Sequence, residues 1–221
     1  MTGQSNGIDL VGLREEAQRL LVGAGEGPGL DQVTRALVGY AVCSSVTTLD
    51  VEAGDRHAGR ALDLGATAGQ LHEVLVLVSG LGVHTLMEGS RSLAALLRAR
   101  GADLPDIDDA RRAMHERHVG SSKYWTLFET HVPGFLEALL RLSPAGFEGF
   151  MRYGAIPSQT KQLTPVTREI ISVAVDATPT HRYMPGLRLH LANAIALGAG
   201  RVALLEAIDI AARAPLPPGV R

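Results

Sequence analysis

Two histidines, His57 and His190, hold equivalent places in a sequence that this chain contains twice. Imidazole exchanges a proton near neutral pH, so a histidine can act as a general acid or base, or can bind an anionic or enolised oxygen. Residues 30–73 align without a gap on residues 163–206 with fourteen identities, where about three would arise by chance. A histidine that only packs among its apolar neighbours is the alternative. Its recurrence in both repeats strengthens the functional interpretation.

Four further side chains are candidates for contact with a small molecule. Tyr183, in the loop before His190, is either a hydrogen-bond donor to a substrate oxygen or an aromatic that covers the core, and His181 precedes it in the same loop. His84 has no histidine counterpart in the second repeat, which favours a role special to the first repeat or none. Trp125 is the only tryptophan; it either lines a pocket or anchors the second repeat.

Arginine also recurs, as Arg35 and Arg168. A guanidinium group at this place is suited to bind a substrate carboxylate through two parallel hydrogen bonds. The alternative, which we favour, is a structural ion pair with Glu73 or Glu206, the carboxylates that also recur in the two repeats.

No metal site is predicted. His115 and His118 are spaced to share one face of a helix, but no third ligand accompanies them, and a solvated helix face is the better interpretation. The glycine-rich residues 23–29 do not have the spacing of a phosphate-binding or dinucleotide-binding loop, and no strand precedes them.

Helical periodicity and capping residues predict an all-α fold made of two tandem helical repeats. Asp31 and Thr164 are N-cap residues at the start of each repeat, and glycines 65 and 198 end a helix in each. We expect an N-terminal helix and linker over 1–29, a first repeat over 30–100, a connector over 101–122 and a second repeat over 123–221. The helices are expected at about 9–22, 31–45, 51–65, 68–80, 83–100, 107–117, in two segments of 123–154, and at 164–177, 184–198 and 201–213.

Composition narrows the classes of function. Apolar residues make up 46% of the 221 residues, enough for a core, and the net charge of −2 with no basic block argues against nucleic-acid binding. Cys43 is the only cysteine, which excludes an internal disulfide and a CxxC redox pair. No uninterrupted apolar run reaches 18 residues and residues 1–16 lack an apolar signal core, so we expect a cytoplasmic protein that does not bind a membrane.

The repeated pattern resembles the carboxymuconolactone decarboxylase family, which includes the alkylhydroperoxidase D-like proteins. In the second repeat the similarity lies in LTPVTREIISVAV (163–175), YMPGLRLH (183–190), AIALGA (194–199) and Glu206. In the first repeat it lies in His57, ALDLGA (61–66), Glu73 and GVHT (82–85). The resemblance covers nearly the whole chain, apart from the N-terminal residues 1–25 and the connector.

The resemblance implies an all-helical fold and assembly of chains. Members with a single repeat form trimers or hexamers, and a tandem chain resembles two fused subunits, so we expect a homodimer or homotrimer. The peroxidase branch has cysteines seven and four residues before its histidine. Asp50 and Ala53 stand there in the first repeat, and Tyr183 and Gly186 in the second. Because thiol-based peroxide reduction needs an attacking and a resolving cysteine, we do not expect that activity.

The resemblance also places Glu169 near His190, because the family has a glutamate at this position. The first repeat has Ala36 instead, which implies one competent and one degenerate site per chain. The alternative for Glu169 is a surface carboxylate favoured by the positive end of its helix. We therefore expect a cofactor-independent lyase or isomerase that acts on a small carbonyl-conjugated organic acid, lactone or enol, with His190, Glu169, Tyr183 and His57 as candidate catalytic residues and Arg168, His84, His181 and Trp125 as candidate substrate-binding residues.

Such tandem members are implied to be tailoring enzymes of specialised metabolism. Two other interpretations stay open. One is a non-catalytic ligand-binding or assembly protein with the same fold, which the missing cysteines and the unmatched Glu169 support. The other, weaker one is a redox protein that uses Cys43, which would need a lowered thiol pKa. A small buried apolar side chain is the better interpretation of Cys43.

Overall fold

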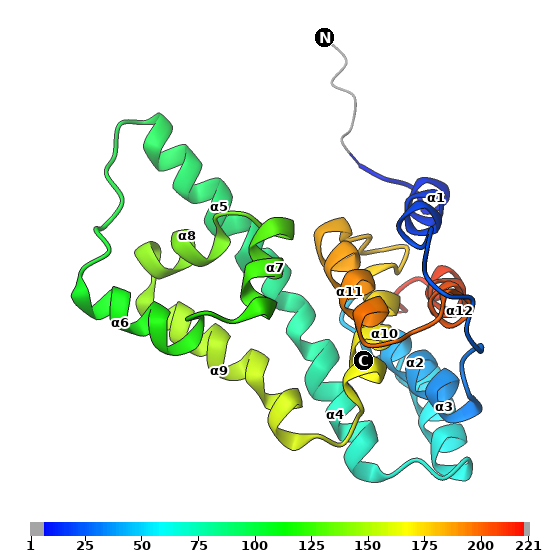
Figure 1. The fold of residues 1–221 in the computed structure, drawn as a ribbon. Helices are drawn as coiled ribbons and strands as arrows, with labels where there is room; N and C mark the ends of the chain where they lie inside the picture. Colours follow the sequence, from blue (N-terminus) through cyan, green and yellow to red (C-terminus); the bar gives the residue numbers. More distant parts are fainter. Residues whose placement is uncertain (1–6, 219–221) are drawn as a thin grey trace. The chain divides into compact units, whose positions relative to one another are not determined.

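The computed structural model describes residues 7–218, and over this part of the chain every regular element is a helix (Figure 1). The all-α prediction is therefore confirmed. The helices form two compact units, the first from the residues up to Ser79 and from Lys161 on, the second from Gly80–Thr160. The first unit contains α1 (Leu10–Leu20), α2 (Gln32–Ser44), α3 (Val51–Asp63), α4 (Ala68–Ser79), α10 (Pro165–Asp176), α11 (Met184–Ala196) and α12 (Arg201–Ala212). The second contains a 3-10 turn, η1 (Gly80–Gly82), with α5 (Val83–Ala99), α6 (Asp109–His118), α7 (Lys123–His131), α8 (Phe135–Leu142) and α9 (Pro144–Thr160).

The first helix of each repeat begins at its predicted capping residue. The Asp31 carboxylate accepts a hydrogen bond from the backbone N–H of Thr34 (2.8 Å), and the Thr164 hydroxyl accepts one from Thr167 (3.2 Å). These bonds satisfy N–H groups that the start of a helix otherwise leaves without a partner. Pro165 takes the first position of α10, where its missing N–H costs nothing. Local sequence thus fixes where α2 and α10 start.

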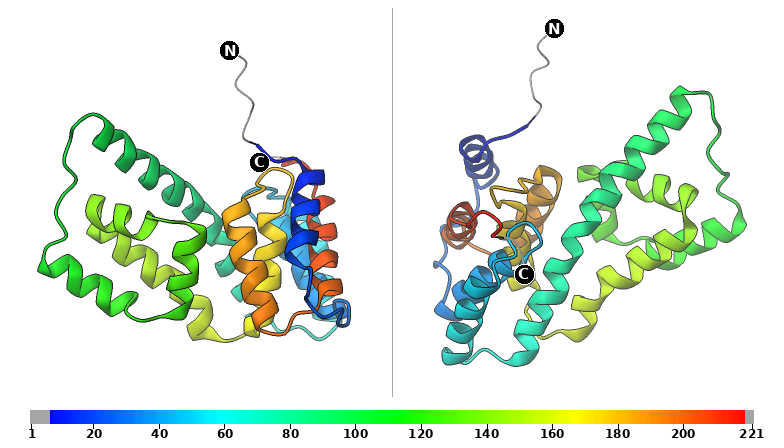
Figure 2. Two further views of the ribbon diagram at one scale, coloured as in Figure 1. Left: turned by 45° about the horizontal axis from the view of Figure 1, so that its top comes forward. Right: turned by 180° about the vertical axis from the view of Figure 1, so that it is seen from behind.

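Helices α2 and α10 pack against each other and form the centre of the first unit. Helix α2 also contacts α3 and α4 of its own repeat and α12 of the other, while α10 contacts α11 and α12 of its own repeat and α4 of the other. Helix α1 packs against both α11 and α12 (Figure 2). Fully buried apolar side chains fill this centre, among them Leu37, Val38, Ile171, Val173 and Ala174. The two repeats therefore share one core.

The loop between the first two helices has the same backbone conformation in both repeats. Leu49 and Arg182, which are equivalent in the alignment, both have a positive φ, 43° and 48°. The residue after each donates its backbone N–H to a carbonyl near the end of the preceding helix, that of Cys43 or Asp176, in both cases at 2.9 Å. A positive φ is uncommon for a residue with a side chain, so its recurrence shows that the two loops are built alike.

The second unit is built around α8, which packs against α5 and α9 (Figure 2). Its core is rich in aromatic side chains and includes Phe128, Phe135, Leu139 and Phe147. The stretch 123–154 was expected to form two helices, and it forms three, because Gly134 adopts a left-handed φ of 76° before α8 and Ser143 leaves helical geometry before α9. The two compact units do not coincide with the two predicted repeats. Helices α2–α4 of the first repeat and α10–α12 of the second pack together in one unit, and the helices between them form the other.

One helical run, Ala68–Ala99, is long and apolar enough over the described residues to cross a membrane by length and composition alone. It does not contain the 18 consecutive apolar residues that were sought in the sequence, because polar residues such as Gln70 and Glu73 lie within it. A helix from the core of a water-soluble protein meets the same measure, so this one run is weak support for a membrane protein.

Candidate functional site

The helical hairpin α10–α11 brings Glu169 and His190 together. Ring nitrogen Nδ1 of His190 lies 2.7 Å from Oε2 of Glu169, and the side-chain amide of Asn193 donates to the same oxygen at 3.4 Å. The two side chains are 18% and 19% exposed, which shields the pair from bulk water and still leaves it accessible. Asn193 lies three residues after His190, on the same face of α11, so a single helix supplies two donors to one carboxylate.

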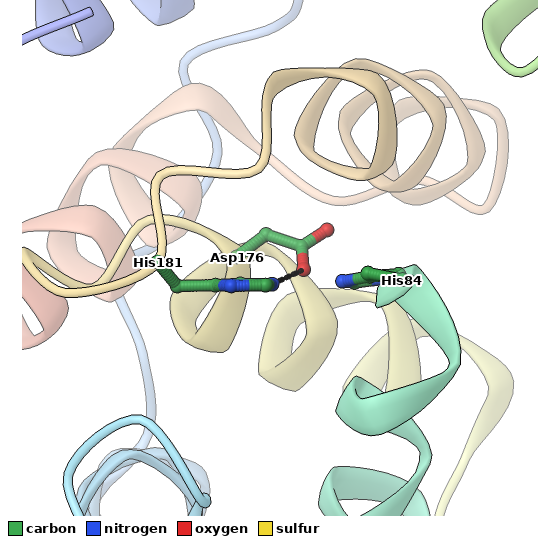
Figure 3. Close-up of side chains that lie close together, drawn as sticks. All are labelled: His84, Asp176 and His181. Atoms are coloured by element: carbon green, nitrogen blue, oxygen red, sulfur yellow. Dashed lines mark ion pairs between the residues drawn. The ribbon is translucent and has the colours of Figure 1, made fainter. Parts of the chain in front are cut away.

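Asp176, the last residue of α10, faces the same histidine from the other side. Its carboxylate has one oxygen 4.0 Å from Nε2 of His190 and the other 3.7 Å from Nε2 of His181. Figure 3 shows the second of these contacts, with the His181 ring pointing at the carboxylate. The Asp176 side chain is only 2% exposed. His190 therefore lies between two carboxylates, and His181 contacts the more deeply buried one.

Gly186 leaves the space that Asp176 occupies. A Cβ atom at this position would lie 2.2 Å from Oδ2 of Asp176 and 2.9 Å from the Tyr183 ring. Gly186 lies one helical turn before His190, at the place where the peroxidase branch has its second cysteine. The buried carboxylate and a side chain at position 186 are thus mutually exclusive in this backbone.

The charges at this site set its protonation near neutral pH. Burial raises the pKa of Asp176 to about 7, with the His190 charge acting against the rise and the Glu169 charge adding to it. Burial by itself would lower the pKa of His190, but the hydrogen bond and charge of Glu169, together with the charge of Asp176, outweigh it and raise that pKa above its usual value. Burial lowers the pKa of His181. Asp176 therefore has a pKa near neutrality beside a histidine whose pKa is raised, a combination typical of functional sites.

The equivalent place in the first repeat lacks both carboxylates. Ala36 replaces Glu169 and Cys43 replaces Asp176. The ring of His57 packs against Gly39, where a Cβ atom would lie 2.5 Å from it. Burial, with the positive charges of two neighbouring arginines, lowers the pKa of His57. Of the two predicted histidines, one has a carboxylate partner and the other is held mainly by packing.

Cys43 does not have the environment of a reactive thiol. It is buried in α2, and burial, with a contribution from the Asp50 charge, raises the pKa of its thiol. A reactive cysteine needs a lowered pKa to be present as thiolate. The buried apolar role is the better account of this residue.

The two recurrent arginines pair across the repeats. Arg168 lies 3.4 Å from Glu73, whose side chain is 1% exposed, and Arg35 lies 2.8 Å from Glu206. Each glutamate belongs to the other repeat from its arginine. This is the structural ion pair weighed from the sequence, so the carboxylate-clamping role of Arg168 has no support from this geometry.

The remaining candidates are divided between the two units. Tyr183 caps the start of α11, and its ring stacks on that of His181 with 5.7 Å between the centroids, so both belong to the surroundings of His190. His84, which is also drawn in Figure 3, lies in the first turn of α5, and Trp125 lies in α7. The predicted substrate-binding roles of all these residues stay predictions.

Sequence reasoning missed Asp176 as a site residue. The sequence did contain an indication of this role. Asp176 is a lone carboxylate that directly follows the largely apolar stretch Ile170–Val175, and it aligns with Cys43 of the first repeat. A charged side chain is rarely buried unless it has a specific partner, and this one ends on the face of α10 that also carries Glu169.

A solved structure decides the family. A chain from Burkholderia xenovorans LB400, proposed to be a gamma-carboxymuconolactone decarboxylase subunit, matches with 31% sequence identity and a TM-score of 0.71 over 92% of this chain and 90% of that one. The chain belongs to the carboxymuconolactone decarboxylase family. No protein-family model and no curated protein sequence matches it. The all-helical fold of the described residues agrees with this family.

Proposed function

We propose that this member of the carboxymuconolactone decarboxylase family is a cofactor-independent lyase or isomerase. Its substrate class is a small carbonyl-conjugated organic acid, lactone or enol, as the name of the Burkholderia protein also suggests. The observation that carries the proposal is the 2.7 Å hydrogen bond between His190 and Glu169 in a partly shielded place. A carboxylate that orients an imidazole and fixes which ring nitrogen carries the proton supports a role as general acid or base.

Each group has a defined task in a decarboxylation. The bond between the substrate carbon and its carboxylate breaks, CO2 leaves, and the electron pair passes into the conjugated carbonyl to give an enolate. Glu169 accepts the Nδ1–H of His190, so Nε2 is the ring nitrogen left to give a proton to that carbon or to hold the enolate oxygen. Because the substrate itself accepts the electron pair, the step balances without a cofactor.

Asp176 adds a second group that can carry a proton to the pair formed by His190 and Glu169. Its pKa of about 7 means that it is partly protonated at neutral pH, and it lies 4.0 Å from Nε2 of His190. A group with a pKa near the working pH can both take and return a proton. We assign it the return of the proton to His190 between turnovers.

The test is turnover of gamma-carboxymuconolactone and a panel of enol lactones and β-keto acids in D2O. Release of CO2 is measured together with the proton NMR signal of the carbon that loses its carboxylate. The purified chain should release CO2 and place deuterium on that carbon. His190→Gln and Glu169→Gln should each lower kcat about 10²–10⁴-fold, the usual contribution of a general acid or base.

His57→Gln is the matched comparison, since it changes the equivalent histidine of the repeat that lacks the glutamate. We expect its loss of kcat to be at least tenfold smaller than that of His190→Gln. Circular dichroism should show that all three variants stay folded. Binding of the panel without product or deuterium exchange would reject the enzyme and support the non-catalytic ligand-binding alternative.

A further inference from the structure

The second unit contains a cavity of about 980 Å³ between α6, α7 and α8. Glu169, Asp176 and His190 do not line it. Its volume is in the range of pockets that hold small organic ligands. The apolar part of its wall comes from Ile107, Ala113, Val119, Trp125, Leu136 and Leu140. We name it the α6–α8 cavity; neither the family nor the proposed function assigns it a ligand.

Trp125 is held firmly in the wall of this cavity. Its indole ring makes edge-to-face contacts with Tyr124 and Phe128, at centroid distances of 5.0 and 5.2 Å, and a tilted contact with Phe150 at 5.9 Å. Such aromatic contacts fix the orientation of the ring. Tryptophan is also the aromatic side chain that binds organic cations most strongly through its face.

Glu129, which also lines the cavity, has a carboxylate oxygen that lacks a donor. It lies one helical turn after Trp125 on α7, so both side chains share a face of that helix. Oxygen Oε1 accepts the backbone N–H of Gly134. Oxygen Oε2 is shielded from solvent and has no hydrogen-bond partner in the described part of the chain. A buried acceptor without a donor is costly, so a ligand that donates a hydrogen bond there is favoured.

The charges around the α6–α8 cavity favour a cation over an anion. Arg112 is engaged by Asp109 and by the carbonyl of Ile107. Glu137 is engaged by Arg141 at 2.8 Å. No ion pair of Glu116 or Glu129 is found among residues 7–218, and both line the cavity. Two carboxylates are therefore left without a positive partner.

We propose that the α6–α8 cavity binds a small primary amine with an apolar alkyl or aryl body. The ammonium group donates to Oε2 of Glu129 and lies against the ring of Trp125, while the apolar body contacts Leu136 and Leu140. An ammonium group is a donor and a cation at once, so it satisfies both the unpartnered oxygen and the aromatic ring. This inference does not depend on the proposed catalytic function.

Trp125 makes the test direct, because the fluorescence of the only tryptophan reports on this cavity alone. The full chain is titrated at pH 7 with hexylamine, hexanoate and 1-hexanol, three probes of equal length that differ in charge. Hexylamine should give a saturable change in emission with a Kd at least tenfold lower than that of either other probe. Equal affinity for all three would overturn the proposal.

Two variants distinguish the effect of the Glu129 carboxylate from the effect of removing one negative charge from the chain. Glu129→Gln keeps the shape and the acceptor for Gly134, and it should weaken hexylamine binding at least tenfold. Glu52→Gln removes the same charge from an exposed side chain of α3 and should leave the Kd unchanged. Glu116→Gln, at an exposed edge of the cavity, should weaken hexylamine binding two- to threefold. If Glu129→Gln does not fold, this variant provides the test in its place.

Unchanged hexylamine binding in Glu129→Gln would overturn the proposal. The proposal would also be overturned if the tryptophan emission changed with protein concentration but with none of the three probes, because a second copy of the chain would then cover the cavity. Binding of hexylamine is measured without turnover, and a chain that is inactive in the lyase assay can still pass this test.

Discussion

At the residue scale, Gly186 and Asp176 explain how the site departs from a cysteine-based one. The backbone of α11 passes so close to the Asp176 carboxylate that position 186 has room only for hydrogen. Asp176 is 2% exposed and its side chain is short, so it has little space to move away. A second carboxylate beside His190 therefore requires the loss of the side chain at position 186.

The change Gly186→Ala should destabilise the fold by about 1–3 kcal/mol, the usual cost of overpacking a core. This loss is expected even though alanine is the better helix former. The free energy of unfolding is measured by urea denaturation followed by circular dichroism. In the background of Asp176→Ala, the same change should cost markedly less, since the colliding oxygen is then absent.

Gly59→Ala is the control for this prediction. Gly59 lies in α3, the helix equivalent to α11, and a Cβ atom there meets nothing within 4 Å. The substitution should stabilise the chain by up to about 1 kcal/mol through helix propensity. A Gly186→Ala chain as stable as Gly59→Ala would contradict the packing that we describe.

At the element scale, two glutamates fasten the start of each repeat to the third helix of the other. Glu73 of α4 accepts the backbone N–H groups of Gln162 and Leu163, at 2.6 and 3.2 Å. Glu206 of α12 accepts the N–H of Leu30 at 2.6 Å. Leu30 and Leu163 are equivalent in the alignment, so the two contacts are reciprocal. These reciprocal contacts connect the two repeats beside the core that α2 and α10 form.

These two contacts should differ in strength because they differ in burial. The side chain of Glu73 is 1% exposed and that of Glu206 is 30% exposed. Glu73→Ala removes the acceptor of the Gln162 and Leu163 N–H groups, the second of which is buried, and it removes the carboxylate partner of Arg168. It should cost about 3–5 kcal/mol. Glu206→Ala should cost about 1 kcal/mol, because water replaces an exposed partner.

Urea unfolding of both variants measures the difference. The two substitutions are matched, since they remove the same side chain from equivalent helices. Equal losses of unfolding free energy would show that burial does not set the strength of these contacts.

At the scale of the whole molecule, we propose that the chain assembles as a homodimer or homotrimer. Helix α5 carries exposed leucines at positions 86, 93 and 96, which are 37%, 46% and 48% exposed. Their spacing of seven and three residues puts them on one face of the helix. An apolar helix face of this kind is typical of a surface that packs against another chain.

Light scattering after size exclusion should therefore give two or three times the chain mass of 23.4 kDa. The double substitution Leu86→Glu and Leu93→Glu should lower that mass, because charge on an apolar contact face opposes association. A native chain that elutes at 23.4 kDa at micromolar concentration would contradict the proposal. A substitution that reverses a charge on the polar face of α5 is the control, and it should leave the measured mass unchanged.

The sequence predicted much of the fold and part of the site. Helix starts follow from Asp31 and Thr164, and helix ends from Gly65 and Gly198, because caps act within a few residues of themselves. The repeat placed His57 and His190 at equivalent points, and the absence of Glu169 from the first repeat predicted that the two would differ. The contact of His190 with Asp176 was not predicted, because residues fourteen apart meet only when a loop turns α11 back on α10.

What the sequence determined by itself was the set of helices, their repetition and the chemical types available. Those properties depend on neighbours within one or two turns, for which the order of residues is sufficient. Only the tertiary structure decided that the two repeats exchange Glu73 and Glu206, that Arg168 pairs with Glu73 and that His190 stands between two carboxylates. These depend on which helix faces meet, and that is set by the burial of all the apolar side chains together.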